Sequence, residues 1–389
     1  MPVGAALVAC GRGAVRIRSM RVLALVTDAY GGYGGIAQFN RDLTSSFADH
    51  DAVESVRVVP RLAPDANDGE QSPKVRQDRA IHNRLFYALN SFRVALQYKP
   101  HVVFCGHLYM APLAYVISKF LRVPFWLQLH GLEAWQRPSA VIRSAAERAD
   151  LITIVSRHTR GRFLSWANVA PHGVRILPNT FDTPGPAPAT KDDLKQRYGL
   201  AGFTIMLTVS RIDSGDRYKG HHKVLAILPK LLESRPDLVY VVVGDGNARE
   251  SLEGLASQLG VSASVRFVGR VSRQALHDYY RLADVFIMPS TKEGFGIVFL
   301  EAASFGLPVI GGNVDGSVDA LGEGGVGVAV NPDVPESLAA AVESVLAPGS
   351  HRFNGPQRFS RQRFSRHVAD LLRLVQETPR GEECRVPGY

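Results

Sequence analysis

The chain has 389 residues, of which 46% are hydrophobic and 21% charged, as in a globular protein of two or three domains. Its three cysteines, Cys10, Cys105 and Cys384, are too few and too widely spaced for a disulfide framework or a cysteine-based zinc site. Free thiols fit a reducing cytoplasm. The net charge is +9, but no basic motif interleaved with aromatic residues accompanies it, so no nucleic-acid partner is expected.

The excess positive charge lies in the first half of the chain. Residues 1–181 hold 22 Lys and Arg against 12 Asp and Glu, whereas residues 182–389 hold 23 against 24. Such a field favours an anionic membrane or a phosphorylated acceptor, although a basic solubilising face explains it equally well. No stretch is apolar over the ~18–20 residues of a transmembrane helix, so any membrane contact is expected to be peripheral.

Residues 1–19 make a poor secretory signal, because their apolar run is short and the basic residues follow it. Met20 directly precedes a strong strand pattern. We therefore expect residues 1–19 to be a disordered extension or a misassigned start.

From residue 20 to 182, short apolar runs alternate with amphipathic stretches, which predicts helices on both faces of a mostly parallel sheet. Residues 60–73 are polar and are expected to form a surface loop. The expected strands are 21–27, 55–59, 102–106, 125–129, 151–155 and 175–177, and the expected helices include 36–48, 79–98, 112–120 and 139–149.

The segment 183–190, TPGPAPAT, holds three prolines and is expected to be a linker between two domains. Residues 191–350 repeat the alternation, so the fold class is α/β, with two Rossmann-like domains, 20–182 and 191–350, facing a cleft. The expected strands there are 204–210, 239–244, 265–268, 285–289, 308–311 and 326–330, and the expected helices are 225–233, 248–259, 273–282, 296–305 and 335–346.

The most informative segment is 288–312, MPSTKEGFGIVFLEAASFGLPVIGG. A buried strand ends, and Gly294, Phe295 and Gly296 open a helix whose free amides and positive dipole end suit a phosphate. Glu293 precedes this helix and Glu301 lies about two turns inside it, so both can point toward one pocket. A carboxylate can accept hydrogen bonds from two hydroxyls of a sugar. The spacing alone would fit two surface glutamates, but the flanking glycines favour a ligand site.

A second segment, 209–220, reads VSRIDSGDRYKG and places Arg211 and Lys219 in one loop after a strand. Together these cations could neutralise a diphosphate leaving group without a metal. Arg217 is a further candidate cation in the same loop. Taken alone, two solvated loop cations would be the simpler interpretation.

Two segments of the first half complete the candidate site. The turn 30–35, YGGYGG, lets the backbone approach a ligand at Gly34 and Gly35. It lacks the acidic partner of a dehydrogenase. His130 ends a strand, a position that favours a functional role over the structural role usual for a lone histidine. Glu133 is a candidate for handling the acceptor.

The sequence Glu293-Gly294-Phe295-Gly296, followed by Glu301-Ala302 and by Gly306-Leu307-Pro308-Val309, resembles the donor-site signature of the retaining glycosyltransferases of family 4. The resemblance covers residues 20–378 and implies the GT-B fold. It also implies that residues 351–378 contain a helix that crosses back onto the first domain, followed by a tail at 379–389.

The resemblance assigns roles to the candidate residues. Glu293 would contact the transferred sugar and Glu301 the ribose, while the amides around Phe295 and Gly296 would face the diphosphate. Arg211 and Lys219 would hold the diphosphate, which Gly34 and Gly35 would approach across the cleft. His130 would contact the sugar, and the stretch FVGRV, with Gly269 and Arg270, would lie beside the base.

The implied reaction moves a sugar, with retention, from GDP-mannose or a UDP-sugar to a glycan or lipid-linked acceptor, by front-face substitution and with no cofactor or metal. Exopolysaccharide or lipopolysaccharide synthesis is the expected context, in the cytoplasm or at the inner face of its membrane. Two alternatives remain open: a nucleotide-sugar 2-epimerase on the same fold, and a non-catalytic GT-B scaffold.

Overall fold

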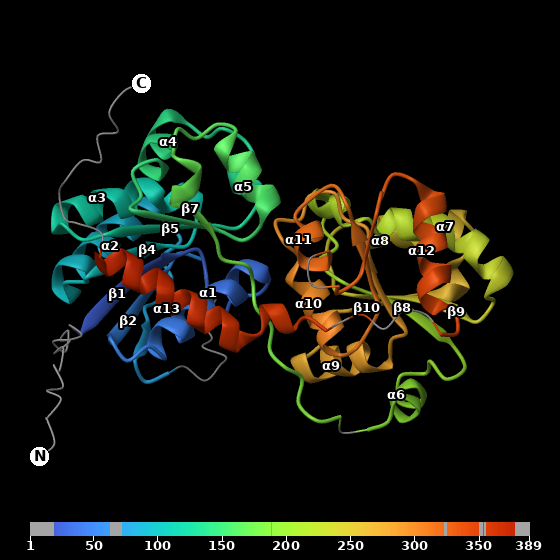
Figure 1. Cartoon of the computed structure of the whole chain (residues 1–389). Coiled ribbons are helices and arrows are strands. Elements are labelled where there is room, and N and C mark those ends of the chain that lie inside the picture. Colours follow the sequence, from blue (N-terminus) through green and yellow to red (C-terminus); the bar gives the residue numbers. More distant parts are fainter. Residues whose placement is uncertain are drawn as a thin grey trace, which may run out of the picture.

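The structure is a computed structural model that describes residues 19–62, 72–187, 189–322, 325–349, 353 and 355–377. It contains two α/β units, each built around one parallel sheet (Figure 1). The expectations for residues 1–18, for most of the loop 60–73 and for the tail 379–389 lie outside the described residues.

The first unit has a seven-stranded sheet in the order β3-β2-β1-β4-β5-β6-β7, with every described pairing parallel. This order begins in the middle of the sheet and winds outward in both directions, as in Rossmann-like folds. The strands are β1 (Met20–Val26), β2 (Val53–Pro60), β3 (Val75–Gln77), β4 (Val102–Cys105), β5 (Phe125–Leu129), β6 (Leu151–Ile154) and β7 (Val174–Ile176).

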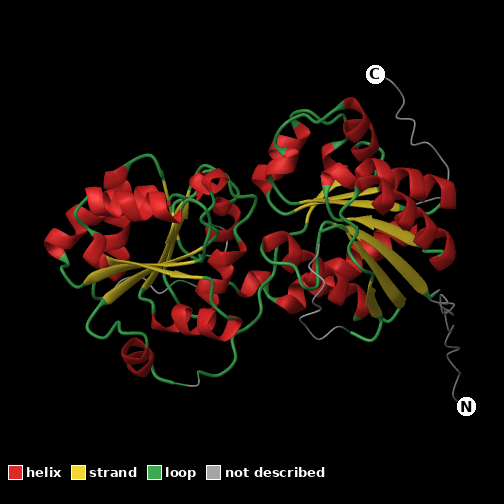
Figure 2. Ribbon diagram, turned by 180° about the vertical axis from the view of Figure 1, so that it is seen from behind, coloured by secondary structure: helices red, strands yellow, loops and turns green. Residues whose placement is uncertain are grey.

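Helices cover both faces of this sheet (Figure 2). The central strands β4 and β5 are buried along their whole length, as expected for strands covered on both faces. The helices of this unit are α1 (Gly35–Ala48), α2 (Arg84–Tyr98), α3 (Ala111–Leu121), α4 (Ala140–Ala146) and α5 (Arg157–Leu164).

The second unit repeats the architecture with a six-stranded parallel sheet in the order β10-β9-β8-β11-β12-β13. Its strands are β8 (Thr204–Val209), β9 (Leu238–Val243), β10 (Val265–Gly269), β11 (Val285–Met288), β12 (Val309–Gly312) and β13 (Val328–Val330). Its helices are α6 (Lys191–Arg197), α7 (His221–Ser234), α8 (Arg249–Gln258), α9 (Arg273–Leu282), α10 (Ile297–Ser304), α11 (Ser317–Leu321) and α12 (Pro335–Leu346).

The last helix, α13 (Arg361–Glu377), returns to the first unit and lies along α1 (Figure 1). Phe364 packs edge-on against Phe39, with ring centroids 5.8 Å apart. The hydroxyls of Ser46 and Ser365 are 2.9 Å apart. The predicted pair of Rossmann-like units with a terminal helix crossing back is therefore confirmed. Among the described helices, none is both long and apolar enough to cross a membrane.

Two predicted helix starts were wrong. Helix α2 begins at Arg84 rather than at residue 79, because the Asn83 side chain accepts hydrogen bonds from the amides of Leu85 and Phe86 and so caps it. Helix α7 begins at His221, four residues before its predicted start. The short elements β3, α5, α6 and α11 were not predicted, because three to eight residues give too little periodicity to detect.

Candidate functional site

The turn between β11 and α10 is shaped by its glycines. Gly296 adopts a φ of 85° at the start of α10, a left-handed conformation that favours glycine. A Cβ there would lie 2.4 Å from the ring of Phe299. Phe295 is buried and packs edge-on against Phe359, with ring centroids 5.4 Å apart. The amide end of α10 is therefore held in place by packing on both sides.

Asp315 fixes the loop that carries Glu293. It is buried, and its Oδ2 accepts hydrogen bonds from the Glu293 amide at 2.6 Å and from the Ser290 hydroxyl at 2.9 Å. Its Oδ1 accepts from the Ser317 amide at 2.9 Å. The Gly316 amide donates to the Glu293 carbonyl at 2.8 Å. Four hydrogen bonds thus set the backbone on either side of Asp315.

Lys219 and Glu293 form an ion pair with both side chains mostly buried. Lys219 ends the 3-10 helix Ser214–Lys219, which follows β8, and Glu293 follows β11. The two loops are joined by a hydrogen bond of 3.0 Å from the Thr291 amide to the Tyr218 carbonyl. Because β8 and β11 are neighbours in the sheet, their carboxyl ends bring these side chains together.

Arg211 stands apart from this pair. Its side chain is 67% exposed and reaches the carboxylate of Asp216 at 3.4 Å. An exposed guanidinium with one long contact can turn toward a ligand at little cost, because the exposed ion pair that it gives up is weak.

The two units meet backbone to backbone at Gly131 and Gly294. A Cβ on Gly294 would lie 2.0 Å from the His130 carbonyl oxygen, and one on Gly131 would lie 2.8 Å from the Gly294 Cα. Neither position can therefore hold a side chain without separating the loops. Arg157 of α5 adds an ion pair across the same interface, to Asp319 of α11, at 2.6 Å.

His130 lies beside this contact and is fixed as a neutral imidazole. Its Nε2 is 3.0 Å from the Gly106 carbonyl, which can only accept, so Nε2 carries the proton. The His130 amide donates to Glu133 at 2.5 Å. Burial lowers the pKa of His130 to about 4, against the opposing charge of Glu133. Glu133 therefore positions the histidine backbone.

The glycine-rich turn of the first unit faces α10 of the second. A Cβ on Gly35 would lie 3.8 Å from Cγ2 of Ile297. Arg41 holds the turn by donating from Nη1 to the carbonyls of Ala29 at 2.6 Å and Gly32 at 2.8 Å. Gly34 and Gly35 are thus brought opposite the amide end of α10.

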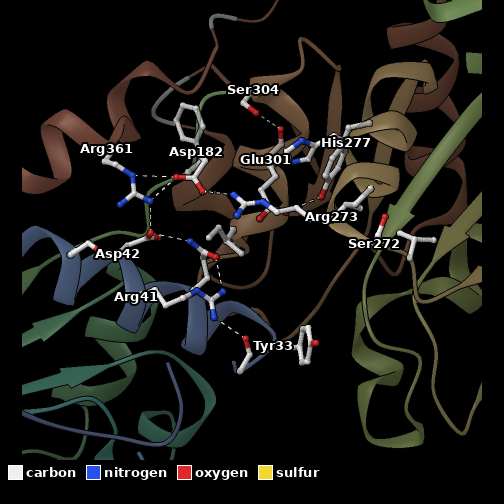
Figure 3. A pocket seen from close by; sticks show the side chains of 18 of the residues that line it. Tyr33, Arg41, Asp42, Asp182, Ser272, Arg273, His277, Glu301, Ser304 and Arg361 are labelled. Atoms are coloured by element: carbon white, nitrogen blue, oxygen red, sulfur yellow. Dashed lines mark hydrogen bonds and ion pairs between the residues drawn. The ribbon is translucent and has the colours of Figure 1, made fainter. Parts of the chain in front are cut away.

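Glu301 lines a cavity of about 830 Å³ between the units (Figure 3). Its carboxylate accepts a hydrogen bond from the Tyr280 hydroxyl at 2.9 Å, and burial raises its pKa. Glu293, Lys219 and Arg211 do not line this cavity. The expectation that Glu293 and Glu301 point toward one pocket stays a prediction, because Glu301 lines this cavity whereas Glu293 is paired with Lys219.

A charged cluster also lines this cavity and joins four segments (Figure 3). Arg361 of α13 contacts Asp42 of α1 at 2.5 Å and Asp182, which follows β7, at 2.6 Å. Arg273 of α9 contacts Asp182 at 2.7 Å. Burial raises the pKa of Asp42 to about 6, against the charge of Arg361. The cluster connects the first unit, the second unit and the crossing helix.

The stretch FVGRV, which was predicted to lie beside the nucleotide base, only partly lines the cavity. Gly269 ends β10 with a φ of 74°, and its carbonyl accepts a hydrogen bond from the Gly244 amide at 2.9 Å. Neither Gly269 nor Arg270 lines the cavity, but the next residues, Val271 and Ser272, do.

Asp315 and Tyr280 were missed in the sequence. Asp315 follows a strand and precedes a glycine, which is a weak signal for a loop-fixing carboxylate. Tyr280 falls on the buried face of α9, where its periodicity indicates only core packing. Among the described residues, no group of three or more His, Cys, Asp or Glu side chains could hold a metal ion.

Comparison with known proteins places both units in one enzyme family. Residues 33–184 match the family model described as Glycosyltransferase Family 4. Residues 190–362 match the model described as Glycosyl transferases group 1. These two ranges contain all the candidate site residues.

Two curated relatives are similar over about half of the chain. A GDP-mannose-dependent alpha-(1-6)-phosphatidylinositol monomannoside mannosyltransferase of Mycolicibacterium smegmatis is 33% identical over 231 residues, 56% of this chain and 59% of that protein. A D-inositol 3-phosphate glycosyltransferase of Nocardiopsis dassonvillei is 33% identical over 213 residues, 51% of this chain and 49% of that protein. The chain thus spans about half the length of these relatives.

Solved structures share the whole architecture at low sequence identity. Anabaena Alr3699/HepE in complex with UDP and glucose superimposes with a TM-score of 0.74 at 19% identity, over 91% of this chain and 99% of that chain. Sucrose-phosphate synthase from Thermosynechococcus elongatus superimposes with a TM-score of 0.74 at 23% identity, over 92% of this chain and 100% of that chain. These likenesses support the GT-B fold.

The neutral His130 makes the stability of the protein dependent on pH. An unfolded histidine titrates near 6.5, whereas the folded pKa is about 4. As the pH falls from 7 to 5 the unfolded state gains a proton that the folded state does not, so the free energy of unfolding decreases by about 2 kcal/mol. Denaturant titrations at both pH values should show a loss about 2 kcal/mol larger for the wild type than for His130→Asn, because His221, whose pKa burial also lowers to about 4, contributes equally in both proteins. Equal losses in the two proteins would contradict the assignment.

Proposed function

We propose that this chain, which belongs to the glycosyltransferases of family 4, transfers mannose from GDP-mannose to a hydroxyl of a lipid-linked acceptor with retention at the anomeric carbon. The observation that carries the proposal is the buried Lys219–Glu293 pair beside the amide end of α10, with Glu301 at the start of the second turn of the same helix. The names of the mannosyltransferase relatives support this choice of donor.

The donor would lie along α10. Its ribose hydroxyls would bind Glu301, and its diphosphate would lie at the amide end of the helix, opposite Gly35. Lys219 would exchange its contact with Glu293 for the diphosphate, and Arg211 would turn in from solvent. The released Glu293 carboxylate would then accept hydrogen bonds from hydroxyls of the sugar.

Transfer would occur by front-face substitution. The bond between the anomeric carbon and the phosphate oxygen breaks, with its electron pair moving to the diphosphate, which Lys219 and Arg211 neutralise. The acceptor oxygen bonds to the anomeric carbon on the same face, and its proton passes to the leaving phosphate. His130 would contact the sugar as a neutral group, and contact between the units would exclude water. We propose that no resident metal or cofactor takes part.

An apolar surface on the first unit supports a peripheral position on a membrane. It consists of Leu85, Phe86 and Leu89 on α2 together with Val116 and Phe120 on α3, all more than half exposed. The rings of Phe92 and Phe120, 5.2 Å apart, join the two helices. Basic residues flank this surface, as expected for contact with an anionic inner leaflet, where a lipid-linked acceptor would be found. They are Arg84, Arg93, Lys119 and Arg122.

Removing a diphosphate contact should slow transfer. We expect Arg211→Ala and Lys219→Ala each to lower turnover roughly 100–1000-fold, as when a donor to a developing negative charge is lost. Turnover is measured by chromatography, and NMR of the anomeric proton reports retention in the wild-type product. Lys230→Ala, an exposed change on α7, is the control. Because Arg211 is exposed, its variant should fold normally, and wild-type turnover in that variant would refute the leaving-group assignment.

Removing the ribose contact should instead weaken donor binding. Glu301→Ala is expected to weaken the affinity for GDP by roughly 1.5–3 kcal/mol, the range for hydrogen bonds to a charged group. Calorimetric titration with GDP measures this effect, and Glu343→Ala, an exposed glutamate on α12, is the matched control. An unchanged Kd in Glu301→Ala would remove Glu301 from the donor site.

The apolar surface gives an independent prediction. Phe86→Ser combined with Phe120→Ser should reduce binding to vesicles that contain anionic lipid at least tenfold, because two large side chains no longer enter the bilayer. Co-sedimentation measures the bound fraction, and Val334→Ser in the second unit is the control. If the double variant still binds as the wild type does, α2 and α3 are not the membrane surface.

A further inference from the structure

A second cavity, of about 470 Å³, lies in the first unit between α2 and the strands β2 and β3. None of the candidate donor-site residues lines it. It therefore requires an explanation of its own. Its described lining residues are Arg57 of β2, Arg76 of β3, Asp78, Arg79 and Ile81 after β3, and Asn90, Arg93, Val94, Gln97 and Tyr98 of α2.

Basic side chains outnumber acidic ones among the described residues that line this cavity. Arg57 and Arg76 are register partners on neighbouring parallel strands, so both side chains leave the same face of the sheet. Like charges placed side by side on a sheet repel each other. Among the described lining residues four are arginines and Asp78 is the one acid. An anion bound in the cavity would relieve the repulsion between Arg57 and Arg76.

Two buried atoms point to the chemistry of that anion. Arg57 pairs with Asp78, yet the Arg57 Nε is buried and has no hydrogen-bond partner among the described residues. A guanidinium group whose Nε–H is still free to donate can bind a phosphate oxygen. The Asp78 Oδ2 is likewise buried and unpartnered within the described part of the chain. A carboxylate oxygen needs a donor, such as a hydroxyl close to that phosphate.

The cavity adjoins the apolar surface of α2. Arg93 follows Phe86 by seven residues and Gln97 follows Arg93 by four residues. This spacing places the three side chains along one side of α2. Arg93 and Gln97 line the cavity, whereas Phe86 is 63% exposed. A ligand bound by Arg93 would therefore lie beside side chains suited to acyl chains.

We propose that this cavity binds the headgroup of an anionic phospholipid that carries hydroxyls, such as phosphatidylglycerol or phosphatidylinositol. The arginines hold the phosphate, Asp78 accepts a headgroup hydroxyl, and the apolar surface of α2 and α3 enters the bilayer beside it. This inference rests on the membrane contact proposed above and is independent of the glycosyl transfer.

The test compares vesicles of phosphatidylcholine alone with vesicles that also contain phosphatidylglycerol or phosphatidylinositol. Arg76→Gln combined with Arg93→Gln removes two exposed charges from the cavity. The matched control is Arg363→Gln combined with Arg373→Gln, which removes two exposed charges from α13 on the same unit. We expect the cavity variant to bind anionic vesicles about 30-fold more weakly than the wild type, and the control variant to bind nearly as the wild type does.

Each other outcome overturns a stated part of the proposal. Equal losses in the two variants would mean diffuse electrostatic attraction and no headgroup site. Wild-type binding by the cavity variant would refute the headgroup site and leave the membrane contact standing. Saturable binding of inorganic phosphate without vesicle binding would refute a lipid as the source. The Kd for GDP, measured for each variant, should stay at the wild-type value, because the cavity lies outside the donor site.

Discussion

The close approach of Gly131 and Gly294 is the contact on which the geometry of the candidate site depends. A Cβ on either residue would overlap the backbone of the other loop, so this distance between the units requires two glycines. His130 precedes Gly131 and Glu293 precedes Gly294, so the same contact sets the separation of these two side chains. Each loop is also fixed by a carboxylate: Glu133 accepts the amide of His130, and Asp315 accepts the amide of Glu293. The site is thus positioned by backbone hydrogen bonds on both sides of the interface.

Helix α10 distributes the proposed donor contacts along its length. Glu293 lies four residues before Ile297, the first residue of α10, and Glu301 lies four residues after it, so the two carboxylates flank the amide end of the helix along the chain. This separation suits a diphosphate placed between a sugar and a ribose. It also explains why Glu301 lines the large cavity while Glu293 pairs with Lys219 outside it. One helix therefore carries two contacts with different chemical roles.

The charged cluster of Asp42, Asp182, Arg273 and Arg361 joins the two units beside the same cavity. Asp42 is almost fully buried, and desolvation raises its pKa to about 6 despite the adjacent arginine. A buried carboxylate with a raised pKa destabilises the folded state above that pH, so the cluster is poor evidence for stability. Its geometry fixes how α13 and α9 approach α1, and through them the position of Glu301 relative to the glycine-rich turn.

The sequence by itself determined the two α/β units and the candidate residues of the donor site, and its resemblance to family 4 implied the crossing helix. It could do so because β5, β11 and the start of α10 carry local signals: apolar runs that end in His130-Gly131 or in Glu293-Gly294-Phe295-Gly296. Short elements such as β3 and α11 escaped prediction, because so few residues show no periodicity. Residue spacing likewise gave no sign that Glu293 pairs with Lys219 and that Glu301 accepts a hydrogen bond from Tyr280.

Only the tertiary structure decided which distant side chains became partners. The pairing of Lys219 with Glu293 depends on β8 lying beside β11, and the contact between Gly131 and Gly294 depends on the docking of the two units. The four arginines of the smaller cavity come together because β2 and β3 pair in register beneath α2. Each of these contacts joins segments that are far apart in the sequence or in separate elements. Local sequence patterns specify the elements, whereas these contacts follow from how the elements pack.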